Sequence, residues 1–355
     1  MSTVSILGAG AMGTALSVPV FDRGHDVRLW GTELDTEIVD TLRRGGPHPR
    51  LGTGIPSGIK PFTQEQLAQA MDGAEIVVIA VTSDAIEKIF RRALSYLNPA
   101  STLVFVTKGF SETAEGRIIL LPELLKNLMS PEQRSSVPIV AVGGPSKANE
   151  VALRVPTAVT YACEDVAVAR KIRDLFMTDT YRIEASFDII GLEISAALKN
   201  TYSIALGICE GLKKPHGYTF NNTKSALFNF AVREMALECQ VAGGRGESAL
   251  GLPGDGDLEV TCEAGRNRVL GELIGGGMGA KEAVDYMRSR DQAVEGYPAA
   301  HFAYRLVRQW EKEGKIKPGA LPFLDACYAI LYEGAPALDT LAETLRKLTD
   351  PSRDA

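Results

Sequence analysis

Three glycines near the start of the chain have the spacing of a phosphate-binding turn. Gly8, Gly10 and Gly13 follow the apolar run 4–7, and an apolar pattern with helical spacing begins directly after them. In this order of strand, turn and helix, Gly8 allows a tight turn, Gly10 lets the backbone approach a pyrophosphate, and Gly13 lets the helix pack closely. Free N–H groups at the helix start favour phosphate. We expect a dinucleotide here; the alternative is a glycine-rich turn without a ligand.

A lysine and an amide lie within a strongly apolar helical pattern farther along the chain. Lys199 and Asn200 follow small residues in the segment 188–212. A buried ammonium is costly unless it is paired, and burial makes a lysine easier to deprotonate, which suits acid–base chemistry. The alternative is a side chain that extends to the surface along its apolar stem.

Carboxylate, hydroxyl and guanidinium groups gather in the segment 254–268. Asp257 and Thr261 are four residues apart and share one face of a predicted helix, where Asp257 can pair with a buried lysine. Arg266 and Asn267 open the next helical pattern, and an arginine beside an amide at a helix start suits a phosphate or pyrophosphate. A calcium loop is the alternative, but the regular oxygen spacing and closing glutamate of such a loop are missing. We expect no metal site.

Two further predicted strands end in polar residues. Lys108 lies at the end of the run 102–107, and Gly144 and Ser146 follow the run 138–142. We expect Lys108 to point into a ligand crevice, with a surface lysine as the alternative. Gly144 permits close backbone approach, and Ser146 either donates to a ligand or caps the helix that follows.

The first half of the chain supplies the elements that hold these turns. Nearly continuous apolar β-forming runs predict a parallel sheet covered on both faces. The predicted strands are 4–7, 26–30, 75–81, 102–107, 138–142 and 157–161. Helical patterns lie between most of them, and the Gly- and Pro-rich segment 45–61 predicts a loop that folds over the cofactor or lies on the surface. The predicted fold class is α/β, with an N-terminal Rossmann-like doubly wound sheet.

The second half of the chain is predicted to be helical. Its helical patterns are 188–212, 223–243, 266–274, 279–288, 297–313, 320–331 and 337–347. We therefore predict a dinucleotide-binding domain over 1–187 and a C-terminal all-helical substrate and catalytic domain over 188–355. The catalytic site is expected in the cleft between them.

Composition and charge narrow the classes of protein. The chain has 355 residues, enough for two domains, and 45% hydrophobic and 23% charged residues, as in soluble globular proteins. A net charge of -6 argues against broad nucleic-acid binding. No apolar run reaches the length of a membrane span, and a strand beginning by residue 4 leaves no room for a signal peptide. Scattered cysteines without a Cys-x-x-Cys pair favour free thiols in a reducing cytoplasm, so we expect a cytoplasmic protein.

Taken in order, a series of motifs resembles the NAD(P)-dependent glycerol-3-phosphate dehydrogenase family. The motifs are Gly8-Ala9-Gly10-x-x-Gly13-Thr14-Ala15, Lys108-Gly109, Gly144-Pro145-Ser146, Ala197-Leu198-Lys199-Asn200, Asn222-Thr223-Lys224, Gly256-Asp257-Leu258 and Gly265-Arg266-Asn267-Arg268. Each motif is weak by itself, but the set is specific and covers residues 3–310. The resemblance implies a Rossmann-like domain followed by a helical domain.

The resemblance also implies an oxidoreductase that reversibly reduces dihydroxyacetone phosphate to glycerol 3-phosphate, with NAD as cofactor and NADP as the alternative. Lys199 is the implied general acid and base, with Asp257 and Lys108 as further catalytic residues. Implied substrate contacts are Lys108, Gly144, Ser146, Asn200, Thr261, Arg266 and Asn267. Implied cofactor contacts are Gly8, Gly10, Ala11, Met12, Gly13, Lys108, Ala148, Arg266 and Glu295. A small phosphorylated substrate is the expected partner, and a homodimer is the expected assembly.

Departures from the family pattern leave the substrate open. They are Met12, Thr82, Lys147, Asn149, Asp255 and an insertion over 213–220. The alternatives are a dehydrogenase of another phosphorylated polyol or of a 2-hydroxy acid, and a non-catalytic nucleotide-sensing protein.

The end of the predicted strand 26–30 bears on the choice of cofactor. No arginine follows it immediately, whereas Glu33 can accept from a ribose hydroxyl and would repel a 2′-phosphate. The sequence therefore predicts a preference for NAD(H) over NADP(H). Folding of Arg43, Arg44 or Arg50 over this site would reverse the preference.

Overall fold

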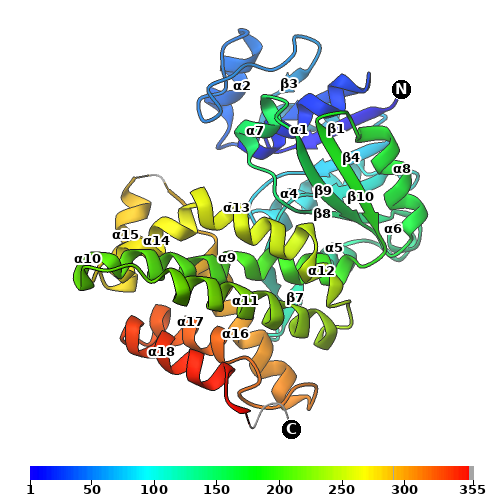
Figure 1. Cartoon of the computed structure of the whole chain (residues 1–355). Coiled ribbons are helices and arrows are strands. Elements are labelled where there is room, and N and C mark those ends of the chain that lie inside the picture. The colour runs from blue at the N-terminus through cyan, green and yellow to red at the C-terminus, as the bar shows by residue number, and fades with distance from the viewer. Residues whose placement is uncertain (291, 352–355) are drawn as a thin grey trace. The chain divides into compact units, whose positions relative to one another are not determined.

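The computed structural model describes residues 1–290 and 292–351, and the chain divides into two compact units (Figure 1). The first unit comprises residues 1–108 and 121–189. The second comprises residues 109–120 and the chain from residue 190 onward. The main difference from the predicted domains is the segment 109–120, which lies within the predicted first domain but packs with the second unit.

The first unit is organised around one sheet with the strand order β10-β9-β8-β5-β4-β1-β2-β3. The strands are β1 (Thr3–Leu7), β2 (Asp26–Trp30), β3 (Lys60–Phe62), β4 (Ile76–Ile79), β5 (Thr102–Phe105), β8 (Ile139–Gly143), β9 (Thr157–Ala162) and β10 (Tyr181–Ser186). The central strands β1, β4, β5 and β8 pair in parallel and are almost entirely buried, as expected for a sheet covered on both faces. The edge strands β3 and β10 were not predicted. β3 has only three residues, one of them proline, and β10 alternates buried with exposed side chains.

One pairing departs from the predicted parallel sheet. β9 runs antiparallel to β8, with Gly143 opposite Thr160, while β10 is parallel to β9. Residues 144–156 join the two strands and include one short helix, α7 (Ala148–Ala152). The chain turns back at the end of β8, and Ala141 lies opposite Ala162.

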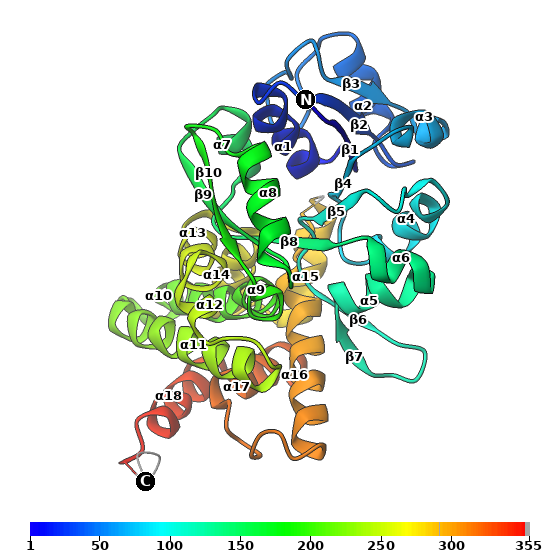
Figure 2. The same cartoon turned by 90° about the vertical axis from the view of Figure 1, so that its right-hand side faces the viewer.

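Helices cover both faces of this sheet. Besides α7, they are α1 (Ala11–Asp22), α2 (Thr36–Arg43), α3 (Leu67–Met71), α4 (Ile86–Ala93), α5 (Leu121–Leu128), α6 (Pro131–Ser136) and α8 (Val166–Phe176), with 3₁₀ turns at Gln64–Gln66 and Leu94–Tyr96. Figure 2 shows α1, α7 and α8 on one side of the sheet and α4, α5 and α6 on the other. Valine and isoleucine side chains of the strands form the core with the apolar faces of α1 and α8.

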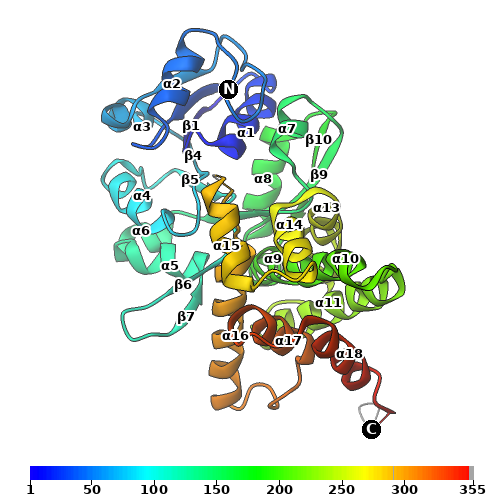
Figure 3. The same ribbon diagram turned by 90° about the vertical axis from the view of Figure 1, so that its left-hand side faces the viewer.

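The second unit is helical in its described residues, apart from one hairpin (Figure 3). Its helices are α9 (Ile189–Gly211), α10 (Lys213–His216), α11 (Asn221–Val241), α12 (Glu247–Leu250), a π turn (Leu252–Gly256), α13 (Asp257–Ala264), α14 (Arg266–Gly275), α15 (Ala280–Ser289), α16 (Gly296–Lys312), α17 (Pro322–Tyr332) and α18 (Ala337–Leu348). The hairpin of β6 (Phe110–Glu112) and β7 (Ile118–Leu120) bonds to α16 through the Arg305–Glu112 ion pair. The predicted fold class is confirmed.

Glycines let two helices of the second unit cross with their backbones in contact. A Cβ at Gly271 of α14 would lie 2.1 Å from the Ile204 carbonyl oxygen of α9, and a Cβ at Gly207 would lie 2.3 Å from the Arg268 carbonyl oxygen. A larger residue at either position would force the helices apart. The crossing therefore fixes α9 against α14, together with the polar side chains that both helices carry.

Candidate active site

The glycine turn lies between β1 and α1, at the carboxyl end of β1. Gly8 has a φ of +116°, and a Cβ there would lie 2.5 Å from the Ala80 carbonyl oxygen. A Cβ at Gly13 would lie 2.0 Å from the Gly8 carbonyl oxygen, so only glycine lets α1 start this close to the turn. Gly10 is different, because a Cβ built on it meets no atom of the described residues within 4 Å, apart from Gly10 itself and its neighbours along the chain. The space beside Gly10 is open to a ligand that approaches the backbone.

The start of α1 offers backbone donors to an anion. Gly10 is its N-cap and provides no side-chain hydrogen bond, and the first turn, which includes Ala11 and Met12, contains no acidic residue. Uncapped N–H groups and the helix dipole attract phosphate. Ala11 and Met12 are both partly exposed. The residues present therefore fit the pyrophosphate of a dinucleotide.

A buried histidine supports this turn from the side. The Nδ1 atom of His48 accepts from the backbone N–H groups of Arg50 at 3.1 Å and Leu51 at 3.3 Å. A neutral imidazole whose Nδ1 accepts carries its proton on Nε2, which donates to the Ala9 carbonyl oxygen at 3.1 Å. Burial lowers the pKa of His48 and favours this neutral form. The same carbonyl also accepts from the Thr14 hydroxyl at 3.0 Å. The sequence analysis did not identify His48.

Further predicted site residues lie at the same edge of the sheet. Because β1, β5 and β8 are parallel, their carboxyl ends meet there. Lys108 follows β5 and is half-buried, and Gly144 follows β8 with a φ of +125°. The Ser146 hydroxyl donates to the Gly144 carbonyl oxygen at 3.4 Å. The N-cap of α7 is Lys147 and Ala148 is its first residue, so the alternative of a Ser146 helix cap is wrong.

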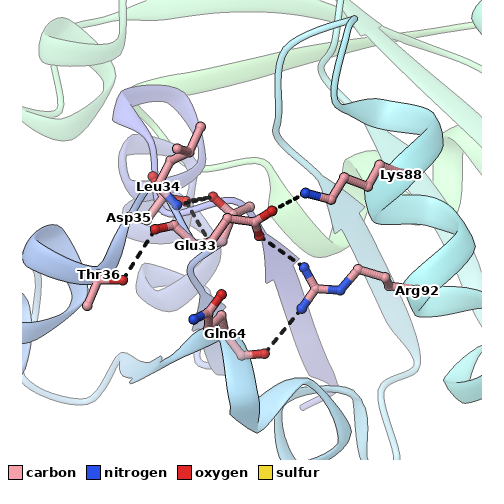
Figure 4. A network of polar contacts seen from close by, with 8 residues as sticks. Glu33, Leu34, Asp35, Thr36, Gln64, Lys88 and Arg92 are labelled. Atoms are coloured by element: carbon pink, nitrogen blue, oxygen red, sulfur yellow. Dashed lines mark hydrogen bonds and ion pairs between the residues drawn. The ribbon is translucent and has the colours of Figure 1, made fainter.

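Asp35 organises the loop that follows β2. Its carboxylate accepts from the backbone N–H of Thr32 at 2.9 Å and from the Thr32 hydroxyl at 2.8 Å. From this turn, the Glu33 carboxylate faces Lys88 and Arg92 of α4 (Figure 4). The hydrogen bond from Lys88 is the main cause that lowers the pKa of Glu33 to about 2.

Lys199 lies inside the second unit and is paired. Its side chain is only 8% exposed, and its Nζ donates to Asp257 Oδ1 at 3.0 Å and to the Thr261 hydroxyl at 2.7 Å. The Thr261 hydroxyl gives its own proton to the Asp257 carbonyl oxygen at 2.6 Å, so a lone pair on Thr261 Oγ1 faces the lysine. The predicted pairing of Lys199 with Asp257 is present. The alternative of a lysine that reaches the surface is wrong.

The amide of Asn200, next to Lys199, belongs to a second polar chain. Asn267 donates from Nδ2 to the Asn200 Oδ1 at 2.9 Å, and its own Oδ1 accepts from the Gly296 N–H at 2.9 Å. A Cβ at Gly296 would lie 2.4 Å from the Asn200 carbonyl oxygen. These contacts join α9, α14 and the start of α16 and fix the orientation of both amides.

Arg266 forms an open ion pair with Glu295 at the start of α14. Arg266 Nη2 lies 3.6 Å from Glu295 Oε1, and the two side chains are 50% and 45% exposed. Such a pair contributes little to stability, so the guanidinium can turn to another anion at little cost. The N-cap of α14 is Gly265, which provides no side-chain hydrogen bond to the helix start.

A pair of buried carboxyl groups lies elsewhere in the second unit. The Tyr202 hydroxyl is 2.9 Å from Glu234 Oε2 and 3.1 Å from Glu238 Oε1. One hydroxyl proton serves only one of these contacts, so the other requires a carboxyl proton. Burial raises the pKa of Glu234 to about 7, although the backbone N–H groups of Phe323 and Leu324 donate to it. Burial also raises the pKa of Glu238 well above its usual value.

Among the described residues, no group of His, Cys, Asp and Glu side chains is arranged to hold a metal ion. No helix within that part of the chain combines the length and apolar character needed to cross a bilayer. The segment 213–220, which departs from the family pattern, forms α10 and a left-handed turn at Gly217, where φ is +78°.

Two family models match the chain. The model for the NAD-dependent glycerol-3-phosphate dehydrogenase N-terminus matches residues 3–169, and the model for the C-terminus of the same family matches residues 188–342. Among solved structures, the glycerol-3-phosphate dehydrogenase from Coxiella burnetii superimposes with a TM-score of 0.81 at 29% identity, covering 97% of this chain and 98% of that chain.

Two relatives extend the similarity along nearly the whole chain. The NADP(+)-dependent glycerol-3-phosphate dehydrogenase of Archaeoglobus fulgidus is 39% identical over 341 residues, which are 96% of this chain and 98% of the relative. The NAD(P)+ glycerol-3-phosphate dehydrogenase of Bacillus pumilus is 33% identical over 352 residues, covering 98% of this chain and 95% of the relative. The chain therefore belongs to the NAD-dependent glycerol-3-phosphate dehydrogenase family.

Proposed function

We propose that the protein reversibly reduces dihydroxyacetone phosphate to glycerol 3-phosphate with a nicotinamide dinucleotide, and that Lys199 is its general acid and base. The observation that carries this proposal is the buried contact of Lys199 with Asp257 and Thr261 in a chain of this family. A ketone that receives a hydride becomes an alkoxide and requires a proton, which Lys199 Nζ donates. In the oxidation direction, the same nitrogen accepts the proton from the alcohol.

Asp257 and Thr261 keep this nitrogen in place. The carboxylate supplies a counter-charge for the ammonium, and the Thr261 hydroxyl oxygen accepts from it at 2.7 Å. Both groups belong to α13, so their spacing is set by one rigid helix. We assign Asp257 the role of holding Lys199 ready to give or take a proton, and Lys108 that of a further catalytic contact.

The glycine turn is the proposed site of the dinucleotide. When bound, the cofactor supplies or accepts the hydride. Gly8, Gly10 and Gly13, with the uncapped N–H groups at Ala11 and Met12, hold its pyrophosphate, and the open space beside Gly10 supports this assignment. The remaining proposed cofactor contacts are Lys108, Ala148, Arg266 and Glu295.

Arg266 is the proposed anchor of the substrate phosphate. Its guanidinium presents a planar fork of donors, which matches phosphate oxygens. Its ion pair with Glu295 is long and exposed, so a phosphate can replace the carboxylate. The remaining proposed substrate contacts are Lys108, Gly144, Ser146, Asn200, Thr261 and Asn267.

Glu33 is the residue that supports a preference for NAD(H) over NADP(H). A carboxylate accepts from a ribose hydroxyl and repels a 2′-phosphate. Arg43, which could have reversed the preference, donates to the Pro61 carbonyl oxygen and to Gln66 instead. The two relatives carry different cofactor names, NADP(+) and NAD(P)+, so the choice for this chain rests on its own residues.

A cytoplasmic homodimer is the proposed cellular form. All five cysteines are buried free thiols, which suits a reducing compartment. Light scattering of the purified protein tests the assembly, and a monomer at micromolar concentration contradicts it.

The decisive experiment follows the oxidation of NADH by dihydroxyacetone phosphate in a steady-state assay. Longer ketose phosphates and a 2-oxo acid serve as competing substrates in the same assay. We expect the highest kcat/KM for dihydroxyacetone phosphate. A higher kcat/KM for a longer ketose phosphate would reassign the substrate, and no turnover with intact NADH binding would identify a nucleotide-sensing protein.

A further inference from the structure

Two cations of α4 hold the Glu33 carboxylate. Lys88 pairs with Oε1, and Arg92 Nη1 lies 3.1 Å from Oε2 (Figure 4). The other end of the guanidinium donates to the Gln64 carbonyl oxygen at 3.3 Å, and its carbon lies 5.0 Å from the centre of the Trp30 ring. The guanidinium is therefore held in one orientation, with Glu33 as its charged partner.

This group of charges lies beside the glycine turn. β2 pairs with β1 as far as Leu7 opposite Trp30, and the Gly8 N–H donates to the Trp30 carbonyl oxygen at 2.8 Å. Glu33 follows Trp30 by three residues. It lies within the turn that is stabilised by hydrogen bonds from Thr32 to the Asp35 carboxylate. In a dinucleotide fold the ribose 2′ position is read at the end of this strand. The charges of Glu33, Lys88 and Arg92 thus lie at the end of the strand where a dinucleotide bound at the glycine turn would present the group that differs between NAD and NADP.

The balance of charge is one carboxylate against two cations. Lys88 and Arg92 are four residues apart and share one face of α4. The side chains of Glu33 and Arg92 are 35% and 34% exposed, and that of Lys88 is 65% exposed, so a ligand can reach all three. A phosphate carries the charge and the oxygen acceptors that an ammonium and a guanidinium fork bind best.

We propose that Lys88 and Arg92 form a ready receiver for the 2′-phosphate of NADP, and that Glu33 blocks this receiver by acting as its internal counter-ion. This inference rests on the proposed function, because it assumes that a dinucleotide binds at the glycine turn. With Glu33 present, a 2′-phosphate meets a carboxylate that already occupies both cations, and the ribose hydroxyl of NAD is preferred. Removal of the Glu33 carboxylate leaves Lys88 and Arg92 without this partner, so the preference changes from NAD to NADP.

The test measures binding of NADH and NADPH to the full chain by fluorescence titration, without substrate. In Glu33→Gln, we expect the Kd for NADPH to fall at least about tenfold, because charge-assisted hydrogen bonds replace repulsion, while the Kd for NADH changes less than about threefold. Adding Lys88→Met and Arg92→Met to Glu33→Gln should abolish the gain. The matched control is Glu87→Gln. It removes a carboxylate from α4, the helix of Lys88 and Arg92, but Glu87 pairs with Arg91 at 2.7 Å instead of with those two cations. It should leave both affinities unchanged.

The outcomes separate this inference from the proposed function. An unchanged NADPH affinity in Glu33→Gln, or a gain that survives in the triple variant, overturns the inference alone. A wild-type chain that binds neither dinucleotide overturns both proposals. The expected shifts in affinity combined with no turnover of dihydroxyacetone phosphate support the inference and overturn the substrate assignment.

Discussion

The candidate sites of the two units use different chemical groups. In the first unit, the glycine turn and the start of α1 offer backbone N–H groups, and the side chains of Thr14 and His48 support that turn. In the second unit, the proposed chemistry belongs to side chains, with Lys199, Asp257 and Thr261 in direct contact. A backbone site depends on which residues are small, whereas a side-chain site depends on which residues carry charge. Substitutions in the two units should therefore impair activity in different ways.

The largest expected effect comes from removing the proposed proton donor. Lys199→Met keeps much of the apolar stem but removes the charge and the proton. General acid catalysis contributes about 10²–10⁴-fold, so kcat should fall by at least about a hundredfold. The Kd for NADH should stay unchanged, because the glycine turn is intact.

Lys199→Arg is the matched control, because it keeps a cation beside Asp257 but holds its proton too tightly to donate it. We expect it to melt near the wild-type temperature and still to lose most of kcat. A folded Lys199→Met or Lys199→Arg protein with near-normal kcat would remove Lys199 from the mechanism.

The second effect concerns the substrate phosphate. Arg266→Ala removes a charge-assisted contact worth about 1.5–3 kcal/mol, so KM for dihydroxyacetone phosphate should rise about 10- to 150-fold. Arg266→Lys should recover only part of the loss, because a point charge lacks the planar fork. Steady-state kinetics at saturating NADH measures both variants. An unchanged kcat/KM in Arg266→Ala would mean that the residue has only a structural role.

The contrast between a backbone site and a side-chain site also explains which parts of each site the sequence predicts. The glycine turn was predictable because its residues are close in sequence and two of its glycines answer a local requirement: the positive φ of Gly8 and the close start of α1 at Gly13. The pairing of Lys199 with Asp257 spans 58 residues, and it was predicted only because a buried lysine needs a counter-charge. His48 was not identified, since a contact over 39 residues between a loop and one carbonyl leaves no periodic pattern. The direction of β9 was likewise missed, because its apolar composition resembles that of the parallel strands although it pairs antiparallel to β8.

A third effect tests the buried carboxyl groups of the second unit. Both Glu234 and Glu238 have a raised pKa in the folded chain, to about 7 for Glu234. Between the ordinary carboxyl pKa of about 4.3 and a pH of about 7, the folded chain therefore binds more protons than the unfolded chain. The free energy of unfolding should fall as the pH rises through this window, with a slope approaching about 1.4 kcal/mol per pH unit for one group.

Urea unfolding between pH 5 and 7.5 measures this slope. Glu238→Gln should reduce this slope without abolishing it, because the amide does not titrate yet still donates to the Tyr202 oxygen, while Glu234 still titrates. An equally steep slope in Glu238→Gln would assign the pH dependence to other groups.

The smallest effect should come from His48, because the glycine turn is a backbone site. His48→Ala removes one of two hydrogen bonds to the Ala9 carbonyl oxygen, while Thr14 still donates to it at 3.0 Å. A single neutral hydrogen bond contributes about 1 kcal/mol, so KM for NADH should rise only about fivefold, with kcat nearly unchanged. His48→Gln, whose amide can donate to the same carbonyl, should recover part of the loss. If His48→Ala instead lowered kcat a hundredfold while the fold remained intact, the glycine turn would also depend on side-chain chemistry. The contrast between the two units would then fail.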